Sequence, residues 1–268
     1  MSFLNKFQFY KKITNTLKLP LLIGMFFMLL PNISLSQDKD KNQAYWVHED
    51  KVKPGMTSEY EKISKEFVAL CKKHNIQDIN WITAVTNDGS YLSISPIDKM
   101  ADLDKNSLAP LQEKIGKEAF SNIFKKYNKC YDTHGGYIVI LNKKLSYMPN
   151  GLTQTQEGMN YRRWHYLYVT PENKSKLKEK LEAVKSLYVK KGSKVHYRVY
   201  QNGFGTMGDY YMVAISSKSG VDYEKNSAEN RTLLGDEAKP IFDDLFKYAS
   251  KYEMKVGSMK PELDYSSN

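Results

Sequence analysis

The sequence predicts an α+β fold in which two antiparallel sheets pack face to face. Two observations favour this class. Segments with alternating polar and apolar residues, typical of strands, are separated by segments whose apolar residues recur at helical spacing. The resulting order, β-α-β-β-α-β, occurs twice along the chain. We therefore expect a first unit over 45–142, a connector over 143–160 and a second unit over 161–265.

Residues 1–36 are expected to be a secretory signal, with cleavage at Ser36-Gln37. They include four lysines and no acidic residue, and an apolar run follows over 19–30. This run is shorter than the about 20 residues that a membrane-spanning helix needs, and an uncleaved anchor is the alternative. The sequence thus predicts a periplasmic or extracellular protein with a flexible lead, 37–44, and no membrane span in the mature chain.

The charge of the chain does not indicate a nucleic-acid partner. The formal net charge is +10 at pH 7, and part of it belongs to the predicted signal. The remaining lysines are spread along predicted helices, whereas nucleic-acid modules gather them with aromatic residues and glycines in a recognised motif. We expect a solvated surface and no nucleic-acid binding.

The chain contains two cysteines, Cys71 and Cys130. An even count in an exported protein is typical of a disulfide. However, each cysteine lies near the C-terminal end of a predicted helix, and the two helices are expected to run antiparallel. Their C-terminal ends therefore lie at opposite edges, whereas a disulfide needs Cα atoms within about 7 Å. We expect both thiols to be free and buried. Cys130 and His134 could supply half of a metal site, but no second half with ligand spacing follows, so the sequence assigns no metal.

In the first unit, turn residues separate the expected elements. Pro54-Gly55 ends the first strand, Asn87-Asp88-Gly89 forms a hairpin turn, Pro96 stops the third strand, and His134-Gly135-Gly136 stops the longest helix. The expected elements are strands over 45–53, 78–86, 90–95 and 137–142, and helices over 57–75, 98–106 and 110–131.

The second unit is expected to repeat this order. Its expected elements are strands over 163–170, 194–201, 210–216 and within 253–265, and helices over 171–191 and 236–252. The glycine-rich segment 203–208 resembles a phosphate-binding loop, but it lies between antiparallel strands and opens no helix. We interpret it as a hairpin at the mouth of the folded unit.

Matched residues indicate that the two units are copies. His48 and His165 are 117 positions apart, and so are Pro54 and Pro171. Two longer matches follow in chain order at offsets of 119 and 120. An ordered series of matches at near-constant offset favours an internal duplication. Because two copies are too few to form a solenoid, we expect them to pack on each other.

Side-chain alternation along the strands predicts the two faces of each sheet. One face carries aliphatic residues and is expected to pack on the helices: Ile82, Ala84, Leu92, Ile94, Val195, Val199, Met212 and Ala214. The other face is aromatic and polar and is expected to line a cavity: Trp46, His48, Trp81, Tyr91, Arg163, His165, His196, Arg198, Tyr200 and Tyr211. The alternation leaves open which face Trp164, Tyr166 and Tyr168 occupy.

The repeated unit with its aromatic, polar sheet face resembles the dimeric α+β barrel superfamily. This ferredoxin-like group includes the antibiotic-biosynthesis monooxygenase-type and NIPSNAP-type domains. The resemblance covers 45–265 at the level of fold pattern. It implies that the sheets meet as a barrel whose inner face binds ligands, and the tandem copy implies closure within one chain. No catalytic motif matches, so no catalytic residue and no cofactor are assigned.

The candidate residues favour an exported binder of a small organic ligand. His48 and His165 are expected to face one cavity, the alternative being two structural histidines kept by duplication. Arg163, His196 and Arg198 could hold an anion, since a guanidinium group matches a carboxylate, the alternative being an internal ion pair. The aromatic residues could line an apolar cavity or simply pack the core.

Two other functions remain open from the sequence. One is a barrel oxidoreductase, cofactor-free or haem-linked, that uses His48 or His165, and the superfamily resemblance alone implies it. The other is a structural or partner-binding protein of the cell envelope that uses a sheet edge or the connector 143–160.

Overall fold

A computed structural model of the chain describes residues 42–151 and 156–267. The predicted signal, 1–36, and most of the predicted lead lie outside the described residues. The strands are β1 (Gln43–Val52), β2 (Asn80–Thr86), β3 (Ser90–Ile97), β4 (Tyr131–Leu141), β5 (Tyr161–Val169), β6 (Tyr197–Asn202), β7 (Asp209–Ser217), β8 (Lys251–Met259) and β9 (Tyr265–Ser266). The helices are α2 (Thr57–Lys73), α3 (Ala109–Ile115), α4 (Lys117–Tyr127), α5 (Lys174–Lys191), α6 (Gly220–Leu234) and α7 (Ala238–Phe246).

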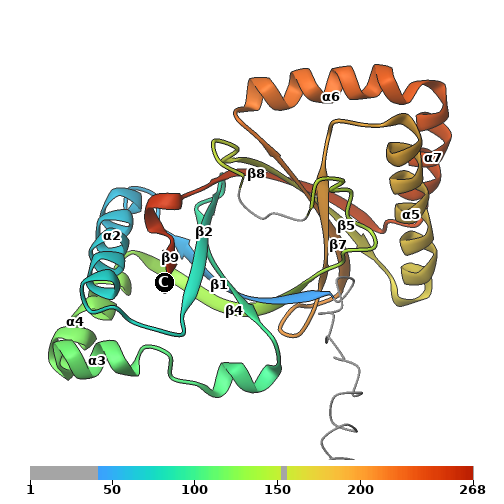
Figure 1. Ribbon diagram of the computed structural model, residues 1–268. Helices are drawn as coiled ribbons and strands as arrows, with labels where there is room; N and C mark the ends of the chain where they lie inside the picture. The colour runs from blue at the N-terminus through green and yellow to red at the C-terminus, as the bar shows by residue number, and fades with distance from the viewer. Residues whose placement is uncertain (1–41, 152–155, 268) are drawn as a thin grey trace, which may run out of the picture. The chain divides into compact units, whose positions relative to one another are not determined.

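Eight antiparallel strands close into a barrel (Figure 1). They follow the order β3-β1-β4-β6-β7-β5-β8-β2, and β2 pairs with β3 to complete the circle. The pairings β4–β6 and β2–β8 join the first half of the chain to the second, with Leu141 opposite Tyr200 and Ala84 opposite Met259. The predicted α+β class and the closure within one chain are therefore confirmed.

Helices cover the outside of the barrel in two groups. Figure 1 shows α2, α3 and α4 beside the strands of the first half, and α5, α6 and α7 beside those of the second. The apolar stripe of α2 buries Tyr60, Ile63, Val68 and Cys71, because its apolar residues recur at helical spacing. The core thus has an inner layer within the barrel and outer layers under the helices.

Three predicted boundaries in the first half are wrong. The helix expected over 110–131 is divided in two at Gly116, whose φ of 87° is a backbone conformation that glycine adopts readily. The second part ends at Tyr127. The segment His134-Gly135-Gly136 lies inside β4, because pairing with β1 outweighs the low strand propensity of glycine. Pro96 lies inside β3, where the β2–β3 pairing has already ended at Ile94.

Helix α6 lies between β7 and the helix expected over 236–252, where the sequence predicted no helix. Sequence periodicity missed it because only Tyr223, Asn230 and Leu234 are buried, so no apolar stripe marks the helix. Its start is set by Ser219, whose hydroxyl accepts a hydrogen bond from the backbone N–H of Asp222 at 3.1 Å. No described helix is long and apolar enough to cross a membrane.

The predicted orientation of the two sheet faces is wrong for most strands. Ile82, Leu92, Met212 and Ala214 line the barrel interior rather than the helix side. The helix side of these strands carries Trp81, Tyr91 and Tyr211, which pack in the outer layers of the core. Val199 packs among the helices as predicted. Cys71 and Cys130 are free and buried, as expected.

Candidate functional site

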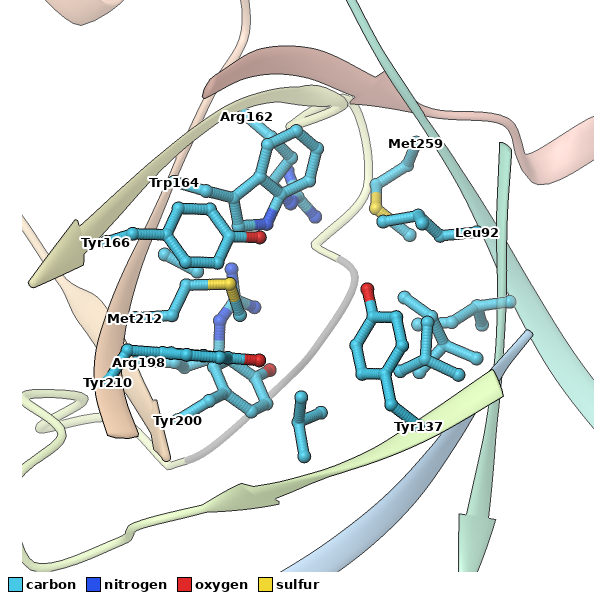
Figure 2. A pocket seen from close by; sticks show the side chains of 15 residues that line it. Leu92, Tyr137, Arg162, Trp164, Tyr166, Arg198, Tyr200, Tyr210, Met212 and Met259 are labelled. Carbon is cyan, nitrogen blue, oxygen red and sulfur yellow. The ribbon is translucent and has the colours of Figure 1, made fainter. Parts of the chain in front are cut away.

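A cavity of about 60 Å³ lies inside the barrel, and all eight strands contribute to its wall (Figure 2). Strand alternation directs every second side chain inward, so each strand supplies one to three lining residues. The wall is mostly apolar and aromatic, with Trp164, Met212 and Met259 among its larger members. Two arginines, Arg162 and Arg198, supply its charge.

Four tyrosines, Tyr137, Tyr166, Tyr200 and Tyr210, join Trp164 in the aromatic part of this wall. The rings of Tyr166 and Tyr210 meet edge to face with centroids 5.4 Å apart, and Tyr168 lies 5.8 Å from Tyr210. Figure 2 shows the hydroxyl groups of Tyr137 and Tyr166 directed towards the centre of the cavity. Burial, aided by the nearby charge of Glu49, raises the pKa of Tyr137, Tyr166 and Tyr210 well above the usual value, so these hydroxyls stay protonated at neutral pH. The Tyr137 hydroxyl donates to the Glu49 carboxylate.

The two arginines lie at one end of the cavity and are almost completely buried, with exposed fractions of 2% for Arg162 and 4% for Arg198. Arg162 donates to the carbonyl oxygens of Met159 and Tyr161, and Arg198 donates to Ser216 Oγ at 2.5 Å. Burial, together with the nearby charge of Arg198, lowers the pKa of Arg162 to about 9. This end of the barrel therefore favours an anion.

A second cavity of about 270 Å³ lies next to this end, and Arg198 belongs to the walls of both. Lys194, His196 and Tyr223 also line it. Burial lowers the pKa of His196, so its imidazole is neutral at neutral pH. Arg198 thus connects a wider outer space to the narrow interior.

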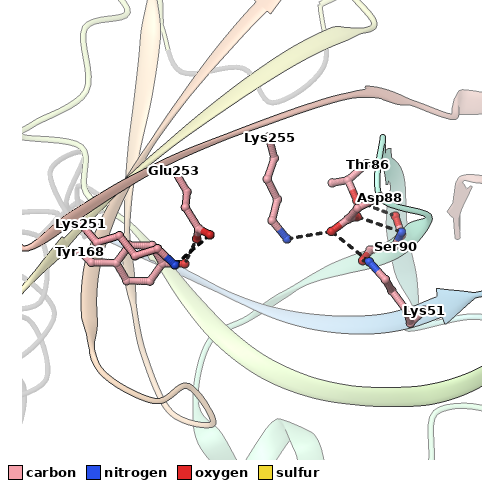
Figure 3. A network of polar contacts seen from close by, with 8 residues as sticks. All are labelled: Lys51, Thr86, Asp88, Ser90, Tyr168, Lys251, Glu253 and Lys255. Carbon is pink, nitrogen blue, oxygen red and sulfur yellow. Dashed lines mark hydrogen bonds and ion pairs between the residues drawn. The ribbon is translucent and has the colours of Figure 1, made fainter.

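The opposite end of the barrel is held by paired charges (Figure 3). Asp88 Oδ2 lies 3.0 Å from Lys51 Nζ and 3.4 Å from Lys255 Nζ. Glu253 accepts from the Tyr168 hydroxyl at 2.7 Å and lies 2.9 Å from Lys251 Nζ. These contacts tie β8 to β5, to β1 and to the turn between β2 and β3.

Burial raises the pKa of Asp88, but hydrogen bonds from Thr86 and Lys51 outweigh it, and the net pKa lies well below the usual value. The carboxylate therefore stays ionised and paired. Charge at this end is balanced between the paired lysines and carboxylates, whereas Arg162 and Arg198 line the wall at the arginine end.

The structure places three of the ten predicted site residues at the cavities. Arg198 and Tyr200 line the interior, and His196 lines the outer space. The other seven lie on the helix-facing side of the wall, so their predicted place in the barrel interior is wrong: Trp46, His48, Trp81, Tyr91, Arg163, His165 and Tyr211.

These seven residues contact helices or neighbouring strands instead. Trp81 stacks on Phe67 of α2 with centroids 5.9 Å apart, and Tyr91 donates to Glu61 at 2.7 Å. Arg163 Nη2 lies 2.6 Å from Glu224 of α6, an ion pair of the kind weighed as its alternative. Each is outward because its neighbours in the strand, such as Leu92 and Trp164, point inward.

Two of these seven residues, His48 and His165, were predicted to face one cavity as a pair. His48 lies beside Asp50 on the side of α2, whereas His165 lies between Tyr223 and Tyr252 on the side of α6. The two imidazoles therefore do not share a space.

Sequence reasoning missed most of the lining residues: Tyr137, Arg162, Trp164, Tyr166, Tyr210 and Met259. One signal pointed to part of this set. Arg162, Trp164, Tyr166 and Tyr168 alternate along β5, and their face was the one left open. The alternation separates the two faces of β5, but it does not show which face the helices cover.

The chain matches no protein-family model, and no curated protein is matched by its sequence. Two solved structures share its fold. An anthrone oxidase-like protein aligns with a TM-score of 0.57 at 10% identity, over 86% of this chain and 95% of that one. A putative monooxygenase from Lactobacillus acidophilus NCFM aligns with a TM-score of 0.51 at 9% identity, over 85% of this chain and 98% of that one. At these identities the likeness is one of ferredoxin-like α+β barrel fold.

Proposed function

We propose that this chain binds a small organic anion with a flat apolar part inside the barrel. The observation that carries the proposal is the pair of buried guanidinium groups, Arg162 and Arg198, at one end of an aromatic cavity. Two like charges in a low-dielectric space repel, and an anion beside them lowers that repulsion. A planar guanidinium also matches the geometry of a carboxylate.

The size of the cavities limits the ligand. The interior of about 60 Å³ is smaller than the about 150 Å³ that takes a benzene molecule. Met212 and Met259 line it, and methionine changes rotamer readily. The anionic group would lie beside Arg198, with the apolar part entering the interior as these side chains shift, or extending into the outer space of about 270 Å³.

A matched ligand series tests this proposal. Thermal shift and tryptophan fluorescence are measured with aromatic carboxylates and with their neutral amides. We expect the carboxylates to stabilise the protein and the amides to bind at least about tenfold more weakly, since charged hydrogen bonds contribute about 1.5–3 kcal/mol. Equal binding of both, or binding of neither, would contradict the proposal.

Neighbouring arginines on β5 provide the control. Arg162 points into the cavity and Arg163 points to α6, so R162M should weaken carboxylate binding at least about tenfold and R163M should not. R198M should match R162M. Near-UV circular dichroism establishes that each variant is folded.

A second candidate function is a cofactor-free oxidoreductase acting on a phenolic substrate in the same cavity. Two features favour it: the fold neighbours are an anthrone oxidase-like protein and a putative monooxygenase, and the neutral Tyr166 hydroxyl could donate to a phenolate. The version in which His48 or His165 acts as a haem ligand inside the barrel loses its basis, since both point outward. Oxygen uptake with hydroquinone-type substrates tests the cofactor-free version, and uptake no faster than in buffer rejects it.

We also infer that the two halves are a tandem duplication and that the chain is exported. The strand orders β2-β3-β1-β4 and β6-β7-β5-β8 are the same within each half, which supports the duplication. The run over 19–30 and the small residues before Gln37 support export. Sequencing the N-terminus of the protein recovered outside the cytoplasm tests this, with Gln37 expected.

A further inference from the structure

We propose that His48, Asp50 and His134 form a binding site for a divalent first-row transition metal on the outer face of the barrel wall. Each residue offers one ligand atom, and these three atoms lie within 4.8 Å of one another. The cluster is separate from the proposed ligand site, because β1 directs Val47 into the cavity and His48 and Asp50 away from it.

Strand pairing brings the three side chains together. His48 and Asp50 are two positions apart on β1 and therefore share one face. In the β1–β4 register, His134 is directly opposite Asp50, and Gly136 is opposite His48. Directly opposed residues have Cβ atoms about 5 Å apart, within reach of one metal ion. Of the half-site that the sequence suggested, Cys130 with His134, only His134 belongs to this cluster, and β1 supplies the other two residues.

The distances are close to those that a metal needs. Zn²⁺ bonds to nitrogen and carboxylate oxygen at about 2.1 Å, which places tetrahedral ligand atoms about 3.4 Å apart. His48 Nε2 and Asp50 Oδ1 are already 3.1 Å apart. His134 is exposed, so its ring can move the remaining distance by side-chain rotation.

A buried hydroxyl fixes the carboxylate. Asp50 is 6% exposed, and its Oδ2 accepts a hydrogen bond from the Tyr60 hydroxyl of α2 at 2.7 Å. Oδ1 is left directed at His48. Such supporting contacts orient ligands and tune affinity in known metal sites.

The donor set and its exposure indicate the class of metal. Two imidazoles and one carboxylate suit Zn²⁺, Co²⁺, Ni²⁺, Cu²⁺ or Fe²⁺ rather than Ca²⁺ or Mg²⁺. The two lysines that follow Asp50 on β1 and after it form ion pairs away from the cluster: Lys51 with Asp88 at 3.0 Å and Lys53 with Asp132 at 3.5 Å. The His48 side chain is 41% exposed, so a bound ion would keep at least one coordination position open to water.

Metal titration of the purified mature protein, prepared without a polyhistidine tag and treated with chelator, tests this proposal. We expect one equivalent of Zn²⁺ by calorimetry, and visible d–d absorption on adding Co²⁺. H48A and H134A should each weaken binding at least about tenfold, and Y60F about tenfold with an altered Co²⁺ spectrum, as for lost supporting contacts.

The control is H74A, because His74 is the C-cap residue of α2, at the opposite end of that helix from Tyr60. It should bind Zn²⁺ like the unchanged protein. Because His48 and His134 are not buried, their variants should fold. The proposal is overturned if no saturable binding occurs, or if the H48A/H134A double variant still binds one equivalent with unchanged affinity.

Discussion

The central strands of the two halves, β1 and β5, place a histidine at the same point of the wall and surround it differently. His48 lies beside Asp50, and His134 is opposite that aspartate on β4. His165 is followed two positions later by Leu167, and Tyr252 of β8 lies opposite that leucine.

The neighbours of the two histidines explain the difference. His165 contacts the hydroxyls of Tyr252 at 2.7 Å and Tyr223 of α6 at 3.2 Å, and burial, aided by the charge of Arg163, lowers its pKa to about 4. It is a neutral structural group under a helix. His48 has a carboxylate partner and remains partly open to solvent. What covers a strand position, and not the position itself, decides whether a histidine packs or can bind.

Placing a carboxylate in the second half at the position equivalent to Asp50 should have the largest effect. Leu167 is 3% exposed within the helix-side core. We expect L167D to lower the free energy of unfolding by about 4 kcal/mol, since it removes buried apolar area and buries a charge. L167M should cost less than about 1.5 kcal/mol. Urea unfolding measures both, and similar costs for the two would show that this site is not rigidly packed.

The titration of His165 should give the next largest effect. The unfolded imidazole has a pKa near 6.5 and the folded one about 4, so the unfolded state binds more protons between these values. Stability should therefore fall as pH drops from 6.5 towards 4, by about 2 kcal/mol.

The variant H165Q should lack this loss, which urea midpoints at pH 7 and pH 4.5 would reveal as a difference between the two proteins. Asp264, whose pKa burial raises to about 6, acts in the opposite sense but is present in both and cancels. Parallel pH profiles would exclude a neutral, buried His165.

Removing one hydroxyl from each half compares a charged with a neutral hydrogen bond. Y60F should cost about 2 kcal/mol because it leaves the buried Asp50 with one donor fewer. Y252F should cost about 1 kcal/mol or less, since the Tyr252 hydroxyl meets a neutral, more exposed imidazole. Thermal unfolding without metal measures both, and a larger cost for Y252F would reverse the assignment.

The smallest effect is expected for H134A without metal. His134 is exposed, so its removal should change the free energy of unfolding by less than about 0.5 kcal/mol. Adding Zn²⁺ should raise the unfolding temperature of the unchanged protein but not of H134A, because binding to the folded state alone stabilises it. An equal rise in both would place the ion elsewhere.

The sequence was sufficient for the order of the barrel strands, because alternation and turn residues such as Asn87-Asp88-Gly89 mark strands locally. The closure of these strands into a barrel was implied by the superfamily resemblance. It was insufficient for the direction of the faces. Alternation shows that Ile82 and Ala84 share a face, but both faces of this wall are buried, one by the barrel and one by helices. Arg198 and Tyr200 were placed inward correctly, whereas Trp81 and Tyr91 were not.

The metal cluster could not be predicted from the sequence for a different reason. The glycines after His134 favoured a helix end, and a residue at a helix end has no cross-strand partner. Only the β1–β4 register, which depends on the folding of both strands, brings His134 opposite Asp50.

The two seams of the barrel, β4–β6 and β2–β8, join parts of a single polypeptide. A barrel assembled from separate subunits falls apart on dilution, and its melting temperature depends on concentration. Here the connector 143–160 joins the two halves and keeps each at a high local concentration of the other, so the barrel should stay closed at any protein concentration. The melting temperature should therefore not change between micromolar and nanomolar protein.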